Sequence, residues 1–139
     1  MTERAAGPLS PARLDRAYVT VWVATLLFFA AFYTLLEPLP RYMVRAGLAD
    51  WEIGLVLGAF GAASLVGRPL AGLLVDRWGP RPALLAGALA MLAGAVAVPM
   101  FRQLWPLFAL RLLQAAGYVA FSTAGTALVL EVSRQARHP

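Results

Sequence analysis

The sequence predicts an all-α protein that crosses a membrane four times. Of its 139 residues, 60% are apolar and 14% are charged, whereas roughly a quarter of the residues in soluble domains are charged. The chain also contains four long apolar runs separated by short polar segments. A helix rises about 1.5 Å per residue, so about twenty apolar residues span the roughly 30 Å hydrocarbon core of a bilayer. These observations indicate a polytopic membrane protein.

The first apolar run occupies residues 17–36 and contains no charged residue. Residues 1–16 before it combine charges, Pro and Gly without apolar periodicity, so we expect an irregular tail there. Glu37 and the proline after it are expected to end the helix. We expect residues 38–52 to form a loop, with Asp50 capping the helix that follows.

Two of the three later spans carry small residues four positions apart, which lets the backbone of another helix approach closely. Gly54 and Gly58 form such a pair on the second span, and Ala86, Ala90 and Gly94 repeat in this way on the third. A polar tail is expected after the fourth span. The second, third and fourth spans are predicted at residues 53–75, 82–101 and 103–130, and the tail at residues 131–139.

The distribution of arginine predicts the orientation of the chain. All twelve basic residues are Arg, and cytoplasmic loops of membrane proteins are enriched in basic residues. Four crossings place both ends on one side, together with the turn between the second and third spans. We therefore expect both termini and this turn to be cytoplasmic, in a cell (inner or plasma) membrane. That side carries Arg4, Arg13, Arg16, Arg77, Arg81, Arg134 and Arg137, and the opposite loops carry Arg41, Arg45 and Arg102.

The composition argues against several classes of function. The chain has no Cys and a single His, His138, so we expect no metal site and no thiol chemistry. We find no nucleophile with a neighbouring base and no phosphate-binding loop, and therefore expect neither an enzyme nor a cofactor. The net charge of +5 could suggest nucleic acid. However, the arginines lie at the ends of apolar runs, as in membrane proteins, so we expect no nucleic-acid partner.

The turn after the second span is a compact charged motif. It reads Gly72-x-x-x-Asp76-Arg77-x-Gly79-x-Arg81. The C-terminal end of a helix is unfavourable for an anion, so we expect Arg77 and Arg81 to compensate Asp76. Gly79 is expected to permit the tight reversal. The alternative interpretation is a short turn that only follows the basic bias of cytoplasmic loops.

The fourth span carries a polar face. Arg111 lies about 12 Å along this helix from its start, and Gln114, Tyr118, Ser122 and Thr126 fall on the same side at 100° per residue. A charge at such a depth usually faces a cavity or a partner, so the stripe predicts a helix that lines a water-filled path. In the alternative interpretation, Arg111 extends to the interface and the hydroxyls bond their own helix.

Other polar residues within or beside the spans are further candidates for a partner or for contact with substrate. Glu37 is a candidate partner for Arg111, although their depths differ by roughly 10 Å. Arg68 is a second intramembrane charge, for which structural pairing or extension to the interface is at least as good an explanation as contact with substrate. On the first span, Thr25, Tyr33 and Thr34 are candidates for substrate contact, although local packing is the more common role of such residues.

Two motifs together resemble the major facilitator superfamily. The turn is similar to that superfamily's signature between helices two and three, G-x-x-x-D-R/K-x-G-x-R/K-R/K, with Pro82 in place of the last base. The segment Arg111-Leu-Leu-Gln114-Ala-Ala-Gly117 resembles its R-x-x-Q-G motif of helix four, although alanine follows Gln114 here. The resemblance covers about residues 17–137.

The resemblance implies both a fold and a function. The four spans would be equivalent to helices one to four of a twelve-helix transporter. The charged turn would be a cytoplasmic gate that engages the other half of the protein, and helix four would line the cavity. The arginine that matches Arg111 is associated with proton coupling in antiporters of the family. The implied function is proton-coupled efflux of a small-molecule substrate by alternating access, with protons and the lipid bilayer as further partners.

The four spans differ from the twelve helices that are usual in the family. We therefore expect the chain to be the N-terminal portion of a transporter that needs helices five to twelve, or other chains, to work. One alternative is a self-standing four-helix exporter of the small multidrug type, working as a dimer. Such an exporter needs an acid within a span, and none lies mid-span here. The other alternative is a non-transporting membrane subunit.

Overall fold

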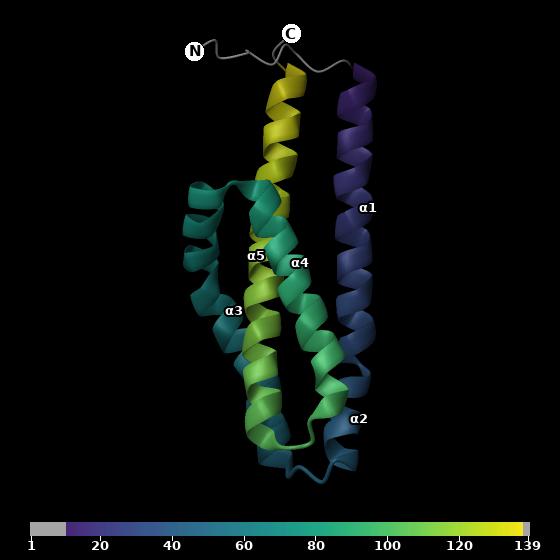
Figure 1. Ribbon diagram of the computed structural model, residues 1–139, viewed down its shortest axis with the longest axis vertical. Coiled ribbons are helices and arrows are strands. Elements are labelled where there is room, and N and C mark those ends of the chain that lie inside the picture. Colours follow the sequence, from purple (N-terminus) through teal and green to yellow (C-terminus); the bar gives the residue numbers. More distant parts are fainter. Residues whose placement is uncertain (1–10, 138–139) are drawn as a thin grey trace.

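The computed structural model describes residues 11–137 and is all-α over that range, which confirms the predicted fold class. Four segments are long and apolar enough to cross a membrane. In Figure 1, the start of α1 and the end of α5 lie at one end of the bundle, and α2 and the α4–α5 connection lie at the other. The helices are α1 (Pro11–Leu36), α2 (Pro38–Arg45), α3 (Asp50–Trp78), α4 (Pro80–Ala97) and α5 (Leu104–Arg137), with a 3₁₀ turn at Val98–Met100.

Helices α1 and α5 extend beyond the predicted spans into segments expected to be irregular. Helix α1 already begins at Pro11, and α5 continues to Arg137. Charged residues such as Glu and Arg mark where an apolar span ends, but they are good helix formers, so the helix itself continues. The remaining parts of the two predicted tails, residues 1–10 and 138–139, lie outside the described residues.

The prediction of a loop over residues 38–52 was wrong for its first half, which forms α2. Its prolines occupy the first helical turn, where no backbone N–H is needed. Leu39 and Met43, four residues apart, are buried in a core cluster with Val56 of α3 and Leu107 of α5. This burial stabilises a short helix that the sequence pattern alone does not favour.

The start of α3 is capped by a residue other than the one expected. The carboxylate of Glu52 accepts a hydrogen bond of 2.7 Å from the backbone N–H of Ala49. Asp50 lies in the first helical turn and not at the capping position, so its predicted capping role was wrong. Both acids lie at the N-terminal end of the helix, where negative charge is favourable.

Helix α5 is the central element of the bundle. In Figure 1 it lies between α3 and α1, and α4 crosses over it. It packs mainly against α3 and α4 and less extensively against α1. Much of α1 and α3 therefore stays exposed, including Leu27 and Leu65. These apolar faces suit contact with lipid or with further helices.

Glycines bring α4 and α5 into close contact. A Cβ atom on Gly87 would lie 2.6 Å from the backbone nitrogen of Phe121 and 2.7 Å from the carbonyl oxygen of Gly117. Of the small residues predicted on this span, Gly94 is buried, whereas Ala86 is exposed. Ala90 also lies at this contact, because a Cβ on Gly117 would be 3.2 Å from its Cβ. The packing face therefore contains Ala90 and Gly94 of the predicted repeat together with Gly87, but not Ala86.

The predicted glycine pair on α3 makes no such contact. Both Gly54 and Gly58 are exposed, and a Cβ on either would meet no atom within 4 Å among the described residues. A close helix approach at this pair therefore does not occur within the described chain.

Candidate functional site

Arg111 lies inside the bundle and not at its surface. Only 2% of this residue is exposed, and Gln114, one turn further along α5, is fully buried. An Nη1 hydrogen of Arg111 is donated to Oε1 of Gln114 over 2.8 Å. Residues three apart share one face of a helix, so α5 itself places this donor beside this acceptor.

Neighbouring helices enclose the pair on two sides. From α3, the ring of Phe60 lies under the guanidinium, with Cζ of Arg111 4.6 Å from the ring centroid. From α4, Gly94 provides the surface on which Gln114 lies, since a Cβ there would be 2.6 Å from Cγ of Gln114. A cation over an aromatic face is stabilised electrostatically, most strongly where water is excluded.

The buried cation is only partly satisfied by these contacts. Nε of Arg111, Nε2 of Gln114 and Oγ of Ser64 are buried without a hydrogen-bond partner among the described residues. Unpaired polar groups are costly in an apolar environment, and ionisable groups inside a membrane usually serve a function. The arrangement leaves Arg111 able to donate to an additional acceptor.

An aromatic cluster connects Arg111 to α1. Phe60 contacts Phe32 of α1 and Tyr118 of α5, with centroids 5.2 Å and 5.4 Å apart. Further along, Phe28 of α1 stacks on Phe121 of α5 at 3.8 Å with an interplanar angle of 5°. We use the name aromatic cluster for Phe28, Phe29, Phe32, Phe60, Tyr118 and Phe121.

The predicted polar stripe of α5 is divided by this cluster. Arg111 and Gln114 lie on one side of it, and Ser122 and Thr126 lie on the other, while Tyr118 is part of the cluster itself. The Ser122 hydroxyl donates to the carbonyl of Val119 over 3.1 Å. The Thr126 hydroxyl donates to the carbonyl of Ser122 over 3.0 Å. Both hydroxyls keep lone pairs that can accept a hydrogen bond.

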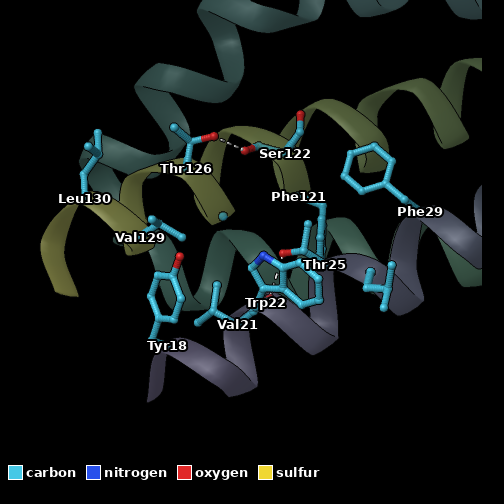
Figure 2. Close-up of a pocket in the computed structure, with 12 residues that line it drawn as sticks. Tyr18, Val21, Trp22, Thr25, Phe29, Phe121, Ser122, Thr126, Val129 and Leu130 are labelled. Carbon is cyan, nitrogen blue, oxygen red and sulfur yellow. Dashed lines mark hydrogen bonds between the residues drawn. The ribbon is translucent and has the colours of Figure 1, made fainter. Parts of the chain in front are cut away.

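Ser122 and Thr126 line a groove between α1 and α5 with a volume of about 530 Å³. Figure 2 shows the ring of Trp22 and the hydroxyl of Tyr18 between the two helices. Thr25, a candidate for substrate contact, also lines the groove, whereas Tyr33 does not. The lining residues are Tyr18, Val21, Trp22, Thr25, Leu26 and Phe29 of α1, and Phe121, Ser122, Gly125, Thr126, Val129 and Leu130 of α5.

The charged turn joins α3 to α4 through a single residue. Gly79 has φ +85°, a conformation that favours glycine, as the sequence predicted. Its N–H donates to the carbonyl of Val75 over 2.8 Å. Asp76, Arg77 and Arg81 are exposed, and within the described residues no ion pair or hydrogen bond joins the acid to either base. Gly72 is half-buried one turn before them.

The two other candidate charges lie apart from the Arg111 pair. Glu37 is exposed at the junction of α1 and α2, so the structure does not bring it to the buried guanidinium. Arg68 is exposed in the middle of α3, beside Pro69, which lies inside that helix. An exposed cation at this depth suits extension to the interface or contact with another helix.

Sequence reasoning missed Phe60 and the aromatic cluster. The available signal was the spacing of Phe28, Phe29 and Phe32, which places three rings on one side of a helix. The same spacing is common in lipid-facing helices, so the pattern does not identify an internal contact. Phe60 has no polar neighbour in sequence, and only the packing of α3 on α5 brings it to Arg111.

Comparison with known proteins covers both motif regions. Residues 21–139 match the family profile described as Major Facilitator Superfamily. An MFS-type transporter of Aspergillus fumigatus is 27% identical over 114 residues, and the match covers 78% of this chain. The chain spans about a quarter of that protein's length, 26%. No solved structure shows a significant match. The profile match includes the charged turn and the whole of α5.

Proposed function

The chain belongs to the Major Facilitator Superfamily, and we propose that it forms the first four membrane helices of a secondary transporter for a small molecule. The superfamily resemblance inferred from two motifs is confirmed by this membership. Membership also favours a transporter over a non-transporting subunit. Residues 11–137 contain four helical segments long and apolar enough to cross a membrane, as expected of a multi-pass membrane protein of this family.

The observation that carries the proposal is the burial of Arg111. A guanidinium that is 2% exposed, with one amide acceptor and one aromatic face as partners, is expensive to keep inside a membrane. A role in transport explains why it is there. We propose that Arg111 alternates between Gln114 and a second acceptor during the cycle. A guanidinium keeps its own protons, so the transported proton would be carried by that second acceptor, a carboxylate.

The carboxylate would come from another helix. Among the acids of the described spans, Asp50, Glu52, Asp76 and Glu131 lie near span ends, and Glu37 is exposed at the junction of α1 and α2. Alternating access generally requires two groups of helices that move against each other around a central site. We therefore propose that these four helices work with helices five to twelve or with other chains. The exposed apolar faces of α1 and α3 support this proposal.

The α3–α4 turn is proposed as a cytoplasmic gate. Its three charges are exposed and so are available to a partner helix end. The carboxylate of Asp76 would be attracted to bases or to a helix N-terminus on that partner. The arginine distribution supports a cytoplasmic position for this turn and for both termini. The mode of transport that we propose is proton-coupled efflux across a cell membrane; it rests on the family resemblance and not on the orientation of the chain.

The proposal is tested in inverted membrane vesicles from cells that express the gene at its native locus. An imposed proton gradient should drive uptake of at least one probe from a panel containing a sugar, an amino acid, ethidium and N-phenyl-1-naphthylamine. Arg111→Gln should abolish this uptake, and Arg102→Gln, the same change in an exposed loop, should not. Equal uptake by the two variants would contradict the role of Arg111.

A further inference from the structure

We infer that the groove between α1 and α5 binds an uncharged aromatic molecule that carries one or two hydrogen-bond donors. This inference rests on the proposed transport function and names the class of substrate. The groove is distinct from the Arg111 pair, from which the aromatic cluster separates it. It opens near the start of α1 and the end of α5, because Tyr18 and Leu130 both line it.

The size and walls of the groove suit a drug-sized ligand. Its volume of about 530 Å³ falls in the range of roughly 300–1,000 Å³ that is typical of small-molecule sites. Trp22, Phe29 and Phe121 supply aromatic walls, which bind flat rings by stacking or edge contacts. The Phe28–Phe121 stack at 3.8 Å closes the inner end, so a ligand would rest against the aromatic cluster.

The polarity of the lining residues narrows the chemical class of ligand that the groove can bind. None of the twelve lining residues is charged, so an ion entering the groove would lose hydration without gaining a counter-ion. The hydroxyls of Thr25, Ser122 and Thr126 already donate to carbonyls of their own helices. They can therefore only accept from a ligand. A sugar needs many donors and acceptors, which these walls do not provide.

The same polar atoms favour a small molecule over a lipid tail or an apolar helix. The three hydroxyls are already bonded to their own helices, but their lone pairs and the donors of Tyr18 and Trp22 remain available. An acyl chain has neither a donor nor an acceptor and would use none of them. The wall at Gly125 is also open, since a Cβ there would meet no atom within 4 Å. Because Gly125 lines the groove, we expect a larger side chain at this position to occupy part of it.

The test uses the full chain in lipid nanodiscs with Trp22 as the only fluorophore. Trp51, Trp78 and Trp105 are each more than half exposed and can be changed to Phe. N-phenyl-1-naphthylamine, an uncharged secondary amine that carries a naphthalene and a phenyl group, should quench Trp22 by energy transfer in a saturable manner. 8-Anilinonaphthalene-1-sulfonate, a close relative that carries a sulfonate, should bind at least about tenfold more weakly, because desolvation of its charge has no compensation.

A matched pair of glycine variants locates the binding. Gly125→Leu should remove the saturable quenching, and Gly61→Leu should retain it, because Gly61 is exposed on α3 and a Cβ there also meets nothing within 4 Å. If Gly125→Leu does not fold by circular dichroism, Val129→Phe narrows the groove from the same helix. Equal quenching in Gly125→Leu (or Val129→Phe) and in Gly61→Leu would overturn the site. It would mean that the probe binds in the lipid, or that a helix already fills the groove. Equal affinity for the sulfonate would overturn the uncharged class.

The readout needs neither a proton gradient nor transport. Binding that depends on Gly125, in a protein that moves no probe under a gradient, would contradict the proposed function and leave the site standing. Gradient-driven transport of a probe without such binding would contradict this inference alone.

Discussion

The contact between α4 and α5 makes Gly87→Ala a sharp test of the structure. The added Cβ would lie 2.6 Å from the backbone nitrogen of Phe121, whereas ordinary Cβ contacts lie at 3.4–4 Å. The obstacle is backbone, so no side chain can rotate away. The two helices must therefore separate by about 0.8 Å at this point, and a gap of that size forfeits roughly a quarter to a half of the dispersion attraction between facing atoms.

The matched control is Gly61→Ala on α3. Both substitutions gain roughly 1 kcal/mol of helix propensity, but a Cβ on Gly61 meets nothing within 4 Å. The difference between the two variants therefore isolates the packing effect. Overpacking typically costs about 1–3 kcal/mol, so Gly87→Ala should have a folded-to-unfolded ratio roughly 5- to 150-fold below that of the control.

The assay is equilibrium unfolding by sodium dodecyl sulfate in mixed micelles, followed by circular dichroism. Gly87→Ala should unfold at a lower fraction of the denaturing detergent than Gly61→Ala. Equal midpoints and slopes for the two variants would refute the close backbone contact between α4 and α5. That contact also positions Gln114 on Gly94, so its failure would undermine the geometry of the buried pair.

Three further substitutions probe the proposed site. Gln114→Leu removes the acceptor of Arg111 and should lower the free energy of unfolding by about 1.5–3 kcal/mol in the same detergent titration, whereas Gln103→Leu in the exposed loop should not. Phe60→Leu removes the ring under the guanidinium and should cost about 0.5–2 kcal/mol, with Phe60→Trp recovering most of it; identical stabilities of the Leu and Trp variants would contradict a cation–π contribution. Asp76→Asn is an exposed change that should alter stability by less than about 0.5 kcal/mol but lower gradient-driven uptake by about tenfold, the effect of roughly 1.4 kcal/mol; unchanged uptake, as expected for the exposed control Glu131→Gln, would contradict the gate.

The four spans could be predicted because a bilayer imposes a simple requirement on the sequence. An apolar run must be long enough to cross, and the charged residues must lie near its ends. The helix limits were less accurate for the same reason. Arg16 and Glu131 mark where hydrocarbon contact stops, but they allow the helix to continue.

Helix α2 and the α4–α5 packing face could not be obtained from local pattern. The prolines of α2 suggest a loop, and its stability comes from Leu39 and Met43 packing against residues far along the chain. Likewise, many small residues on α4 are spaced to form a packing face. Only the position of α5 decides that Gly87, and not Ala86, faces it.

The candidate site was predictable where its chemistry lies on one helix. Arg111 and Gln114 are three residues apart on α5, so helical geometry places them on one face. Their hydrogen bond of 2.8 Å is a contact that was not predicted from the sequence. The contribution of Phe60 depends on the packing of two helices. The groove depends on the separation between α1 and α5. No spacing or motif in the sequence predicts that separation.

The most direct test of the transport account separates coupling from exchange in the same vesicles. Gradient-driven uptake and gradient-free counterflow of a transported probe are measured for Arg111→Gln and Arg111→Lys, with Arg102→Gln as control. If Arg111 couples transport to protons, both Arg111 variants should lose uptake driven by the gradient and keep counterflow. Unchanged gradient-driven uptake, or equal loss of both activities in a folded protein, would contradict the coupling role assigned to this buried charge.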